Sequence, residues 1–403
     1  GCDTRISGGM LASALMAGIC SVGADAIFAG VMPTPAIAYL TRKHKVDAGV
    51  VISASHNPCE YNGIKFFNSD GYKLSDGIEN EIESYILGEK AIEELPTHGK
   101  VGYVSANHNA VEDYVAFAVS TIDCRLDGMK IAVDCANGAS YETAFKALNK
   151  LGANVEAIHN TPDGVNINHM CGSTHMESLQ AYVTSIGADI GIAFDGDADR
   201  MLAVDENGKL IDGDQIMAAC AKFMRDNGTL KQNTLVATVM SNLGLFMAGE
   251  KIGINIPRTK VGDRYVLEEM LAKGYNIGGE QSGHIIFLDH NTTGDGLVSA
   301  LQFLSVLKKT GMKASEAASI VTVMPQVLRN AVVKLENKNS YMENEEIAAA
   351  CKALEDEFAG EGRVLIRPSG TEPLVRVMIE GKDEEYITKK AEELAELIEK
   401  ILG

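Results

Sequence analysis

Short apolar runs alternate with amphipathic stretches along most of the chain, which is the pattern of layered α/β domains. Strands are predicted at residues 46–54, 129–134, 189–194, 200–205 and 234–239. Helices are predicted at about 78–87, 140–151, 264–273, 295–309 and 383–402. From about residue 326 the predicted order changes to strand, helix, strand, strand, helix. The recurring strand–helix units suggest structural repetition, although no short sequence repeat is present.

Residues 6–24 carry no charge, and Ala24-Asp25-Ala26 resembles a signal-peptidase site. Four glycines and three serines dilute the apolarity of this segment. Its larger apolar residues fall on one helical stripe: Leu11, Leu15, Ile19 and Val22. The spacing therefore predicts a buried amphipathic helix rather than a signal peptide or a membrane span.

The composition is that of an ordinary globular protein, with 46% apolar and 23% charged residues. Asp and Glu number 55 against 36 Lys and Arg, and the net charge of −19 argues against a dedicated nucleic-acid or anionic-membrane binder. Eight cysteines without a C-x-x-C pair favour a reducing, cytoplasmic location over a disulfide scaffold or a zinc ribbon.

The polar loop SASHNP (53–58) follows the apolar run at 46–54. Ser, Asn and Pro are ordinary turn residues, so a plain turn explains the loop. Alternatively, Ser55 is a nucleophile or phosphate carrier at a strand end, beside His56. A serine hydroxyl needs a base, a metal or prior phosphorylation to act in this way.

The loop DGDADR (195–200) places Asp195, Asp197 and Asp199 at alternate positions. Carboxylates so close together repel one another unless a cation or hydrogen bonds compensate. Oxygen ligands favour Mg²⁺, Ca²⁺ or Mn²⁺ over zinc. A calcium EF-hand is a poor alternative, because Arg200 replaces the required glycine and the flanks predict strands. A solvated turn is the remaining alternative.

Two further loops carry groups that could bind a phosphorylated sugar. GGEQSGH (278–284) combines glycines with Glu280, Ser282 and His284, although a glycine-rich hairpin explains it about as well. RPSGTEPLVR (367–376) clusters arginines and hydroxyls around a glycine, as an anion-binding turn does, although a surface turn is the alternative. NGIKFF (62–67) and RTKVGDR (258–264) are weaker signals of the same kind.

SASHNP, DGDADR, GEQSGH and RPSGT, in this order and spacing, resemble the motifs of the α-D-phosphohexomutase family. Further stretches at 2–8, 238–245, 260–268 and 285–296 extend the resemblance along the chain and are similar to the bacterial branch acting on glucosamine phosphates. The resemblance implies three related mixed α/β domains plus a smaller C-terminal α+β domain around a central cleft. The expected boundaries are 1–122, 123–222, 223–325 and 326–403.

The resemblance also implies roles for individual residues. One Mg²⁺ would be held by Asp195, Asp197, Asp199 and the phosphate on Ser55. The other residues expected to take part in catalysis are His56, Lys65, Arg200 and His284. The expected substrate-binding residues are Lys260, Gly262, Asp263, Glu280, Ser282, Arg367, Ser369, Gly370, Thr371 and Arg376.

The implied reaction interconverts glucosamine 6-phosphate and glucosamine 1-phosphate through phosphoserine and glucosamine 1,6-bisphosphate, which also serves as activator. Its product would feed UDP-N-acetylglucosamine and cell-wall synthesis, and relatives suggest a homodimer. The alternatives are an enzyme acting on mannose or glucose phosphates, a metal-dependent phosphatase, and an inactive phosphosugar-binding protein.

One departure from the family pattern concerns the first residues. Family members begin with a strand carrying G-T-D-G-V-R-G, whereas this sequence opens at CDTRISG (2–8). A first domain without that strand and its helix would expose a sheet edge and apolar surface. We therefore expect weak activity and poor solubility of this polypeptide alone.

Overall fold

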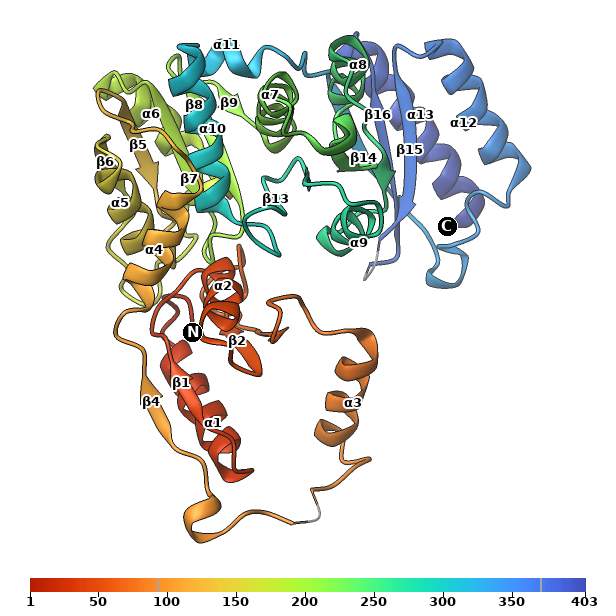
Figure 1. Ribbon diagram of the computed structural model, residues 1–403. Helices are drawn as coiled ribbons and strands as arrows, with labels where there is room; N and C mark the ends of the chain where they lie inside the picture. Colours follow the sequence, from red (N-terminus) through yellow and green to blue (C-terminus); the bar gives the residue numbers. More distant parts are fainter. Residues whose placement is uncertain (93, 370–371) are drawn as a thin grey trace. The chain divides into compact units, whose positions relative to one another are not determined.

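The computed structural model describes residues 1–92, 94–369 and 372–403 (Figure 1). The chain forms two compact units. The larger unit comprises Gly1–Met240 and Ile252–Ile320, and the smaller comprises Ser241–Lys251 and Val321–Gly403. Strands and helices alternate in the larger unit, as the hydrophobic pattern predicts.

The first part of the larger unit is built around short strands. Strand β1 (Ala26–Phe28) pairs in parallel with β4 (Val104–Ala106), and β2 (Ala48–Ile52) pairs antiparallel with β3 (Ile64–Asn68). Cys2 bridges in parallel to both Val31 and Ile52. The helices of this part are α1 (Gly8–Ser21), α2 (Thr34–His44), α3 (Asp76–Ile86), the 3₁₀ turn η1 (His98–Lys100) and α4 (Ala110–Ser120).

Helix α1 exists, but the prediction that its large apolar residues form a buried stripe is wrong. Leu11, Leu15 and Ile19 are only half-buried, and Val22 is 45% exposed. The helix instead packs through small residues, with Ala12 buried against Cys2 and Ile52 and the leucines at the margin of that contact. Within the described residues, every helix is too short or too polar to cross a membrane.

The middle of the larger unit contains a sheet with strand order β6-β5-β7-β8-β9. Strands β6, β5 and β7 are parallel, whereas β8 and β9 continue as antiparallel neighbours. The strands are β5 (Lys130–Asp134), β6 (Asn154–Ile158), β7 (Ile190–Phe194), β8 (Met201–Asp205) and β9 (Leu210–Ile211). The helices are α5 (Ser140–Lys150), η2 (Gly172–Thr174), α6 (Glu177–Ile186) and α7 (Gly213–Asp226).

The last sheet of the larger unit has the order β11-β10-β12-β13. Its strands are β10 (Val236–Thr238), β11 (Arg258–Thr259), β12 (Ile277–Gly279) and β13 (Ile285–Phe287). The helical segments around it are η3 (Lys231–Asn233), α9 (Asp263–Lys273), α10 (Gly296–Thr310) and α11 (Ala314–Ala318). The strands and helices predicted in this region and in the one before it are confirmed.

One arrangement recurs three times within the described part of the larger unit. In each case the first strand of an antiparallel hairpin pairs in parallel with another segment. The β2–β3 hairpin lies beside the Cys2 segment, β7–β8 lies beside β5, and β12–β13 lies beside β10. The hairpin tips are residues 53–63, 195–200 and 280–284. Three of the four predicted polar loops therefore occupy equivalent positions, and the suggested repetition is real at the level of structure.

The smaller unit has an antiparallel sheet of order β14-β16-β15. Its elements are β14 (Gln326–Val332), η4 (Leu335–Asn337), α12 (Glu345–Phe358), β15 (Arg363–Pro368), β16 (Leu374–Glu380) and α13 (Glu384–Leu402), together with most of α8 (Leu243–Ile252). This is the predicted strand, helix, strand, strand, helix order. The helix predicted at 383–402 is also confirmed as α13, and its residues Leu394 and Ile398 are buried in the core of this unit.

Candidate active site

Ser55 lies at the tip of the β2–β3 hairpin, and its backbone is left-handed, with φ of 52°. Its hydroxyl donates to Oδ2 of Asp195 over 2.7 Å. Its N–H donates to the Ser53 hydroxyl over 3.0 Å. A left-handed non-glycine residue is costly unless its surroundings hold it, so the position of Ser55 is imposed by the fold.

A buried ion pair holds the serine loop from one side. The Arg5 guanidinium donates to the carbonyls of Ser55 (3.0 Å) and Asn57 (2.8 Å), and also to that of Pro58. Its Nε donates to Asp3 over 2.8 Å, and the Ser53 hydroxyl donates to the same carboxylate over 2.5 Å. Sequence reasoning treated this segment only as part of a motif and did not assign a function to either charge.

Asn168 holds the same loop from the other side. Its amide donates to the carbonyls of Ser55 (2.8 Å) and Asn57 (3.0 Å). Asn168 comes from the segment between β6 and η2, more than 100 residues away in sequence. No local pattern marks it, and sequence reasoning missed it.

Asp195, Asp197 and Asp199 converge at the tip of the β7–β8 hairpin and could hold a metal ion, since one oxygen from each lies within 4.8 Å of the others. Asp195 and Asp197 are fully buried. Among the described residues, Oδ1 of Asp197 and Oδ1 of Asp199 have no hydrogen-bond partner. Buried carboxylate oxygens without partners are costly, and a hard divalent cation is the group that this donor set suits.

Cationic side chains surround the three carboxylates. Nζ of Lys65 lies 2.6 Å from Oδ2 of Asp197 and 3.9 Å from Oδ2 of Asp199. Burial opposes the charge of Lys65, but these carboxylates outweigh it and raise the pKa of the ammonium. Arg200 lies 3.9 Å from Asp199 and 3.2 Å from Nδ1 of His56, and burial together with Arg200 lowers the His56 pKa.

The carboxylates themselves respond unequally to this environment. Burial, followed by repulsion from Asp199 and Asp197, raises the pKa of Asp195 well above its usual range. Burial also opposes ionisation of Asp199, but the facing His284, Lys65 and Arg200 hold its pKa well below the usual range. The cluster therefore has more acid groups than its neighbours neutralise, as expected of a cation site.

Glycines allow the hairpin tips to touch through their backbones. A Cβ on Gly196 would lie 2.6 Å from the carbonyl oxygen of Ser55 and 2.6 Å from the Asn168 amide nitrogen. Gly283, at φ of 90°, accepts a hydrogen bond from the Met201 N–H over 3.0 Å. These contacts place the serine, aspartate and GGEQSGH loops in one continuous structure.

The GGEQSGH loop presents Glu280 and Ser282 differently. Glu280 accepts the N–H of Gly262 over 3.1 Å, whereas Ser282 is exposed. Gln281 donates to Asp212 over 3.0 Å, and Asp212 caps α7, so this side chain anchors the loop. The exposed Lys260 ammonium lies 5.7 Å from the centre of the Tyr265 ring.

His284 links this loop to the aspartates. It is 3% exposed, with Nδ1 3.5 Å from Asp199 and Nε2 3.5 Å from Asp263. Burial opposes protonation of the imidazole, but the two carboxylates outweigh it and raise the His284 pKa. Asp263, expected to bind substrate, also pairs with Lys73, a residue that sequence reasoning missed. His284 and Asp263 are thus brought to the aspartate cluster.

The smaller unit carries the remaining candidates. Arg367 and Arg376 are cross-strand partners on β15 and β16, and Ser369 is buried beside them. Arg376 donates to Glu372 over 3.1 Å. Two cations directly opposite one another destabilise a sheet unless an anion lies between them, which suits a phosphate site. Gly370 and Thr371 lie outside the described residues.

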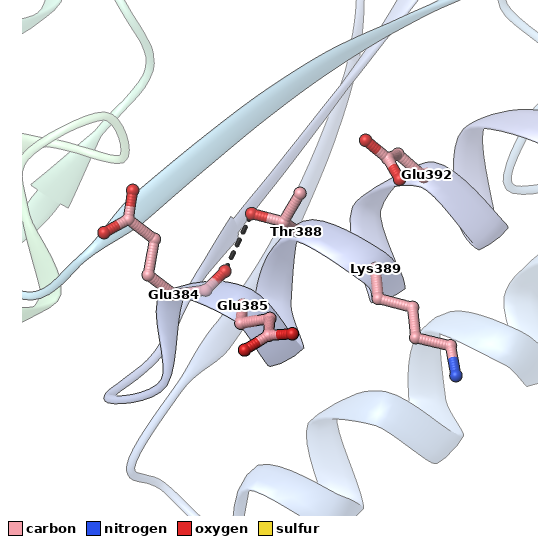
Figure 2. A pocket seen from close by; sticks show the side chains of 5 residues that line it. All are labelled: Glu384, Glu385, Thr388, Lys389 and Glu392. Carbon is pink, nitrogen blue, oxygen red and sulfur yellow. Dashed lines mark hydrogen bonds between the residues drawn. The ribbon is translucent and has the colours of Figure 1, made fainter.

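A shallow hollow on the exposed face of α13 is unrelated to these groups (Figure 2). It is lined by Glu384, Glu385, Thr388, Lys389 and Glu392. Figure 2 shows its one internal hydrogen bond, from the Thr388 hydroxyl to the Glu384 carbonyl. Mostly acidic and solvated, it offers nothing to a phosphorylated sugar.

Four family models match the chain in succession. They are the phosphoglucomutase/phosphomannomutase alpha/beta/alpha domains I, II and III and the C-terminal domain, at residues 1–93, 111–208, 212–324 and 331–397. The chain belongs to the phosphoglucomutase/phosphomannomutase family. The mixed α/β fold class with a smaller C-terminal domain is thereby confirmed.

Individual members of the phosphoglucomutase/phosphomannomutase family are similar over nearly the whole chain. A phosphoglucosamine mutase of Ruminiclostridium cellulolyticum is 62% identical over 99% of this chain and 89% of its own length. One of Acetivibrio thermocellus is 60% identical over 100% of this chain and 90% of its own. A family protein of Burkholderia thailandensis has a TM-score of 0.80 at 23% identity, covering 98% of this chain and 87% of that one. That structural match shows a shared fold.

Proposed function

We propose that the chain is a phosphoglucosamine mutase that interconverts glucosamine 6-phosphate and glucosamine 1-phosphate, with Ser55 as the phosphoryl carrier. The main support is the 2.7 Å hydrogen bond from the Ser55 hydroxyl to Asp195, within a carboxylate cluster that has unpartnered buried oxygens. Relatives about 60% identical are named phosphoglucosamine mutases, which favours glucosamine phosphates over other hexose phosphates.

Asp195, Asp197 and Asp199 would hold Mg²⁺ together with the phosphate on Ser55. When bound, the ion would neutralise charge on the transferring phosphoryl group. Lys65 and Arg200, which already face these carboxylates, would stabilise the remaining negative charge. Phosphoryl transfer depends on positioning and charge neutralisation, and the serine loop is fixed by Arg5 and Asn168 for that purpose.

The chemistry proceeds in two balanced transfers. The bond between phosphorus and the Ser55 oxygen breaks while a bond forms to the free hydroxyl of the sugar phosphate, giving glucosamine 1,6-bisphosphate. The bisphosphate then reorients in the site so that its other phosphate faces Ser55, and the Ser55 oxygen takes that phosphoryl group. In each transfer the attacking hydroxyl loses a proton and the departing oxygen gains one.

Lys65 and His56 are the best-placed groups for these proton transfers. The Lys65 side chain is 28% exposed beside Asp197, and His56 is solvent-exposed at Arg200. His284 is less suited, since it is buried and its Nδ1 and Nε2 face Asp199 and Asp263. We therefore assign His284 a positioning role on Asp199, although the family resemblance implied that it takes part in catalysis.

Substrate binding is divided between loops. Glu280, Ser282 and the turn carrying Lys260, Gly262 and Asp263 would bind the sugar. Arg367, Ser369, Gly370, Thr371 and Arg376 would hold the phosphate that is not reacting. Binding through the phosphate suits a bisphosphate that presents either end.

The test is turnover of glucosamine 6-phosphate by the full chain with Mg²⁺, followed by ³¹P NMR. Ser55→Ala should lower turnover by more than about a thousandfold, with an unchanged circular dichroism spectrum. The exposed Ser120→Ala is the matched control. Intact-mass analysis should find one phosphoryl group on the wild-type chain and none on Ser55→Ala.

Other results would favour the alternatives. Steady release of inorganic phosphate would indicate a phosphatase. A higher kcat/KM on glucose or mannose phosphates would indicate a sister mutase. Sugar-phosphate binding without turnover or phosphoserine would indicate a binding protein, and substantial activity of Ser55→Ala would reject the carrier role.

A further inference from the structure

A second group of metal-ligand side chains lies apart from the three aspartates. Asp134 ends β5, His159 follows β6, and Cys171 precedes η2. One ligand atom of each residue lies within 4.8 Å of the other two. Nδ1 of His159 is 2.9 Å from Oδ2 of Asp134. The topology of the β6-β5-β7 sheet thus joins three residues that share no sequence motif.

The carboxylate at the centre of this group is held rigidly. Oδ1 of Asp134 accepts the N–H of Ala136 over 2.8 Å, and Oδ2 accepts the N–H of Gly172 over 3.0 Å. Asp134 and Cys171 are fully buried, whereas the His159 side chain is 31% exposed. Hydrogen bonds of this kind orient carboxylate ligands in metal sites, and the imidazole edge provides access from solvent.

The chemistry of the three groups differs from that of the aspartate cluster. A thiolate, an imidazole and a carboxylate are ligands for zinc, whereas Mg²⁺ prefers oxygen alone. We propose that Asp134, His159 and Cys171 bind one Zn²⁺, with water at the fourth position. Cys171 is a free thiol in this structure and so is available as a ligand.

Charge balance supports a site of this composition in the protein interior. Zn²⁺ would displace the proton between His159 and Asp134 and the proton of the Cys171 thiol. The bound site would then hold a thiolate, a carboxylate, a neutral imidazole and a dication, with no net charge.

The site belongs to the same segment that holds the serine loop. Asn168, which donates to the Ser55 and Asn57 carbonyls, comes three residues before Cys171. Its own N–H donates to the carbonyl of Ala136, two residues after Asp134. Zinc binding to the native chain would therefore stabilise the support of Ser55.

The test uses Co²⁺ alone as a spectroscopic probe on the metal-free full chain, because a thiolate ligand gives a charge-transfer absorption that carboxylates do not. One equivalent should produce this absorption, Zn²⁺ should remove it, and excess Mg²⁺ should leave it. Cys171→Ser should abolish it. His159 has φ of 45°, a backbone conformation that asparagine tolerates. His159→Asn should therefore keep the backbone and weaken Co²⁺ binding at least about tenfold.

Matched controls separate this site from other thiols. Cys135→Ser removes a buried cysteine adjacent to Asp134, and Cys59→Ser removes a more accessible one. Both should retain the absorption. Its absence from the wild-type chain, or its persistence in Cys171→Ser, would overturn the proposal and leave an ion pair beside a buried thiol. Neither outcome depends on mutase activity, so the proposed function is tested separately.

Discussion

The ammonium nitrogen of Lys65 lies 2.6 Å from Oδ2 of Asp197, and the Thr34 hydroxyl donates to the same oxygen over 2.6 Å. Lys65 comes from the hairpin that carries Ser55, and Asp197 from the next hairpin. The lysine therefore contributes positive charge to the carboxylates that would receive a divalent cation. Lysine and cation share these ligands and repel each other.

Lys65→Met should accordingly bind Mg²⁺ more tightly while turning over more slowly. Removal of one neighbouring positive charge should raise the Mg²⁺ affinity on the order of fivefold, about 1 kcal/mol. If Lys65 serves proton transfer as proposed, its loss should lower kcat about a hundredfold. Titration calorimetry and steady-state kinetics measure the two effects, with the exposed Lys352→Met as control. Weaker Mg²⁺ binding would contradict this interpretation of Lys65.

Gly196→Ala should separate the serine and aspartate loops. The added methyl group would lie 2.6 Å from the Ser55 carbonyl oxygen, and backbone cannot yield as a flexible side chain does. Overpacking of this kind costs about 1–3 kcal/mol, and displacement of Ser55 should lower turnover about a hundredfold. Gly77→Ala, on α3 with open space around it, is the matched control and should leave the activity unchanged and the stability undiminished. Urea unfolding and turnover report the outcome.

Asn168 can be tested with two substitutions that separate side-chain contact from backbone strain. Both Asn168→Gly and Asn168→Ala lose the hydrogen bonds to the Ser55 and Asn57 carbonyls, and kcat should fall in both. Only the alanine variant also carries the cost of a side chain at φ of 58°. Its free energy of unfolding should therefore be about 1 kcal/mol lower than that of the glycine variant. Equal stability of the two variants would show that strain at this position is unimportant.

Arg376→Met should weaken phosphate binding by the smaller unit. Arg367 and Arg376 face each other across β15 and β16, and in the proposed site each would supply charged donors to one anion. Loss of one such partner should reduce phosphate affinity at least about tenfold. The measurement is the shift in Tm of the full chain with added inorganic phosphate. A shift as large as that of the wild type would remove Arg376 from the clamp.

Glu206 gives a prediction about pH. The Glu206 carboxylate accepts hydrogen bonds from the Ser315 N–H over 3.2 Å and from the Ser315 hydroxyl over 2.5 Å. Burial opposes ionisation of Glu206, but these hydrogen bonds outweigh it and hold the Glu206 pKa below its usual value. Because the Glu206 pKa is lower in the folded chain than in the unfolded chain, ionised Glu206 stabilises the fold. This stabilisation is complete above the pKa of the unfolded chain, near 4.3, and is lost as the pH falls through the pKa of the folded chain.

Glu206→Gln should therefore cost about 1 kcal/mol of unfolding free energy at pH 7, since the carboxylate is only partly buried. The difference from wild type should shrink as pH is lowered below about 4. Urea unfolding across this range measures it, and the exposed Glu396→Gln provides the control. A difference independent of pH would contradict the assignment.

Local pattern predicted much of the site, because Ser55 and the three aspartates follow apolar strands directly. The partners of these residues were not predictable in the same way. Thr34 and Asp197 are 163 residues apart, and Asn168 and Ser55 are 113 apart, so only the folded chain joins them. The error at α1 has a similar origin, since Ala12 and Cys20 pack more closely than the leucines that dominate the periodicity.

The recurrence of one hairpin in three sheets has a consequence for engineering. Each tip carries a different chemistry on the same scaffold, so the tip at 280–284, which we propose binds the sugar, can be redesigned as a module. The tips nevertheless meet through glycine backbones, where even one methyl group does not fit. Libraries that aim to change sugar preference should therefore vary Glu280 and Ser282 and leave Gly196 and Gly283 untouched.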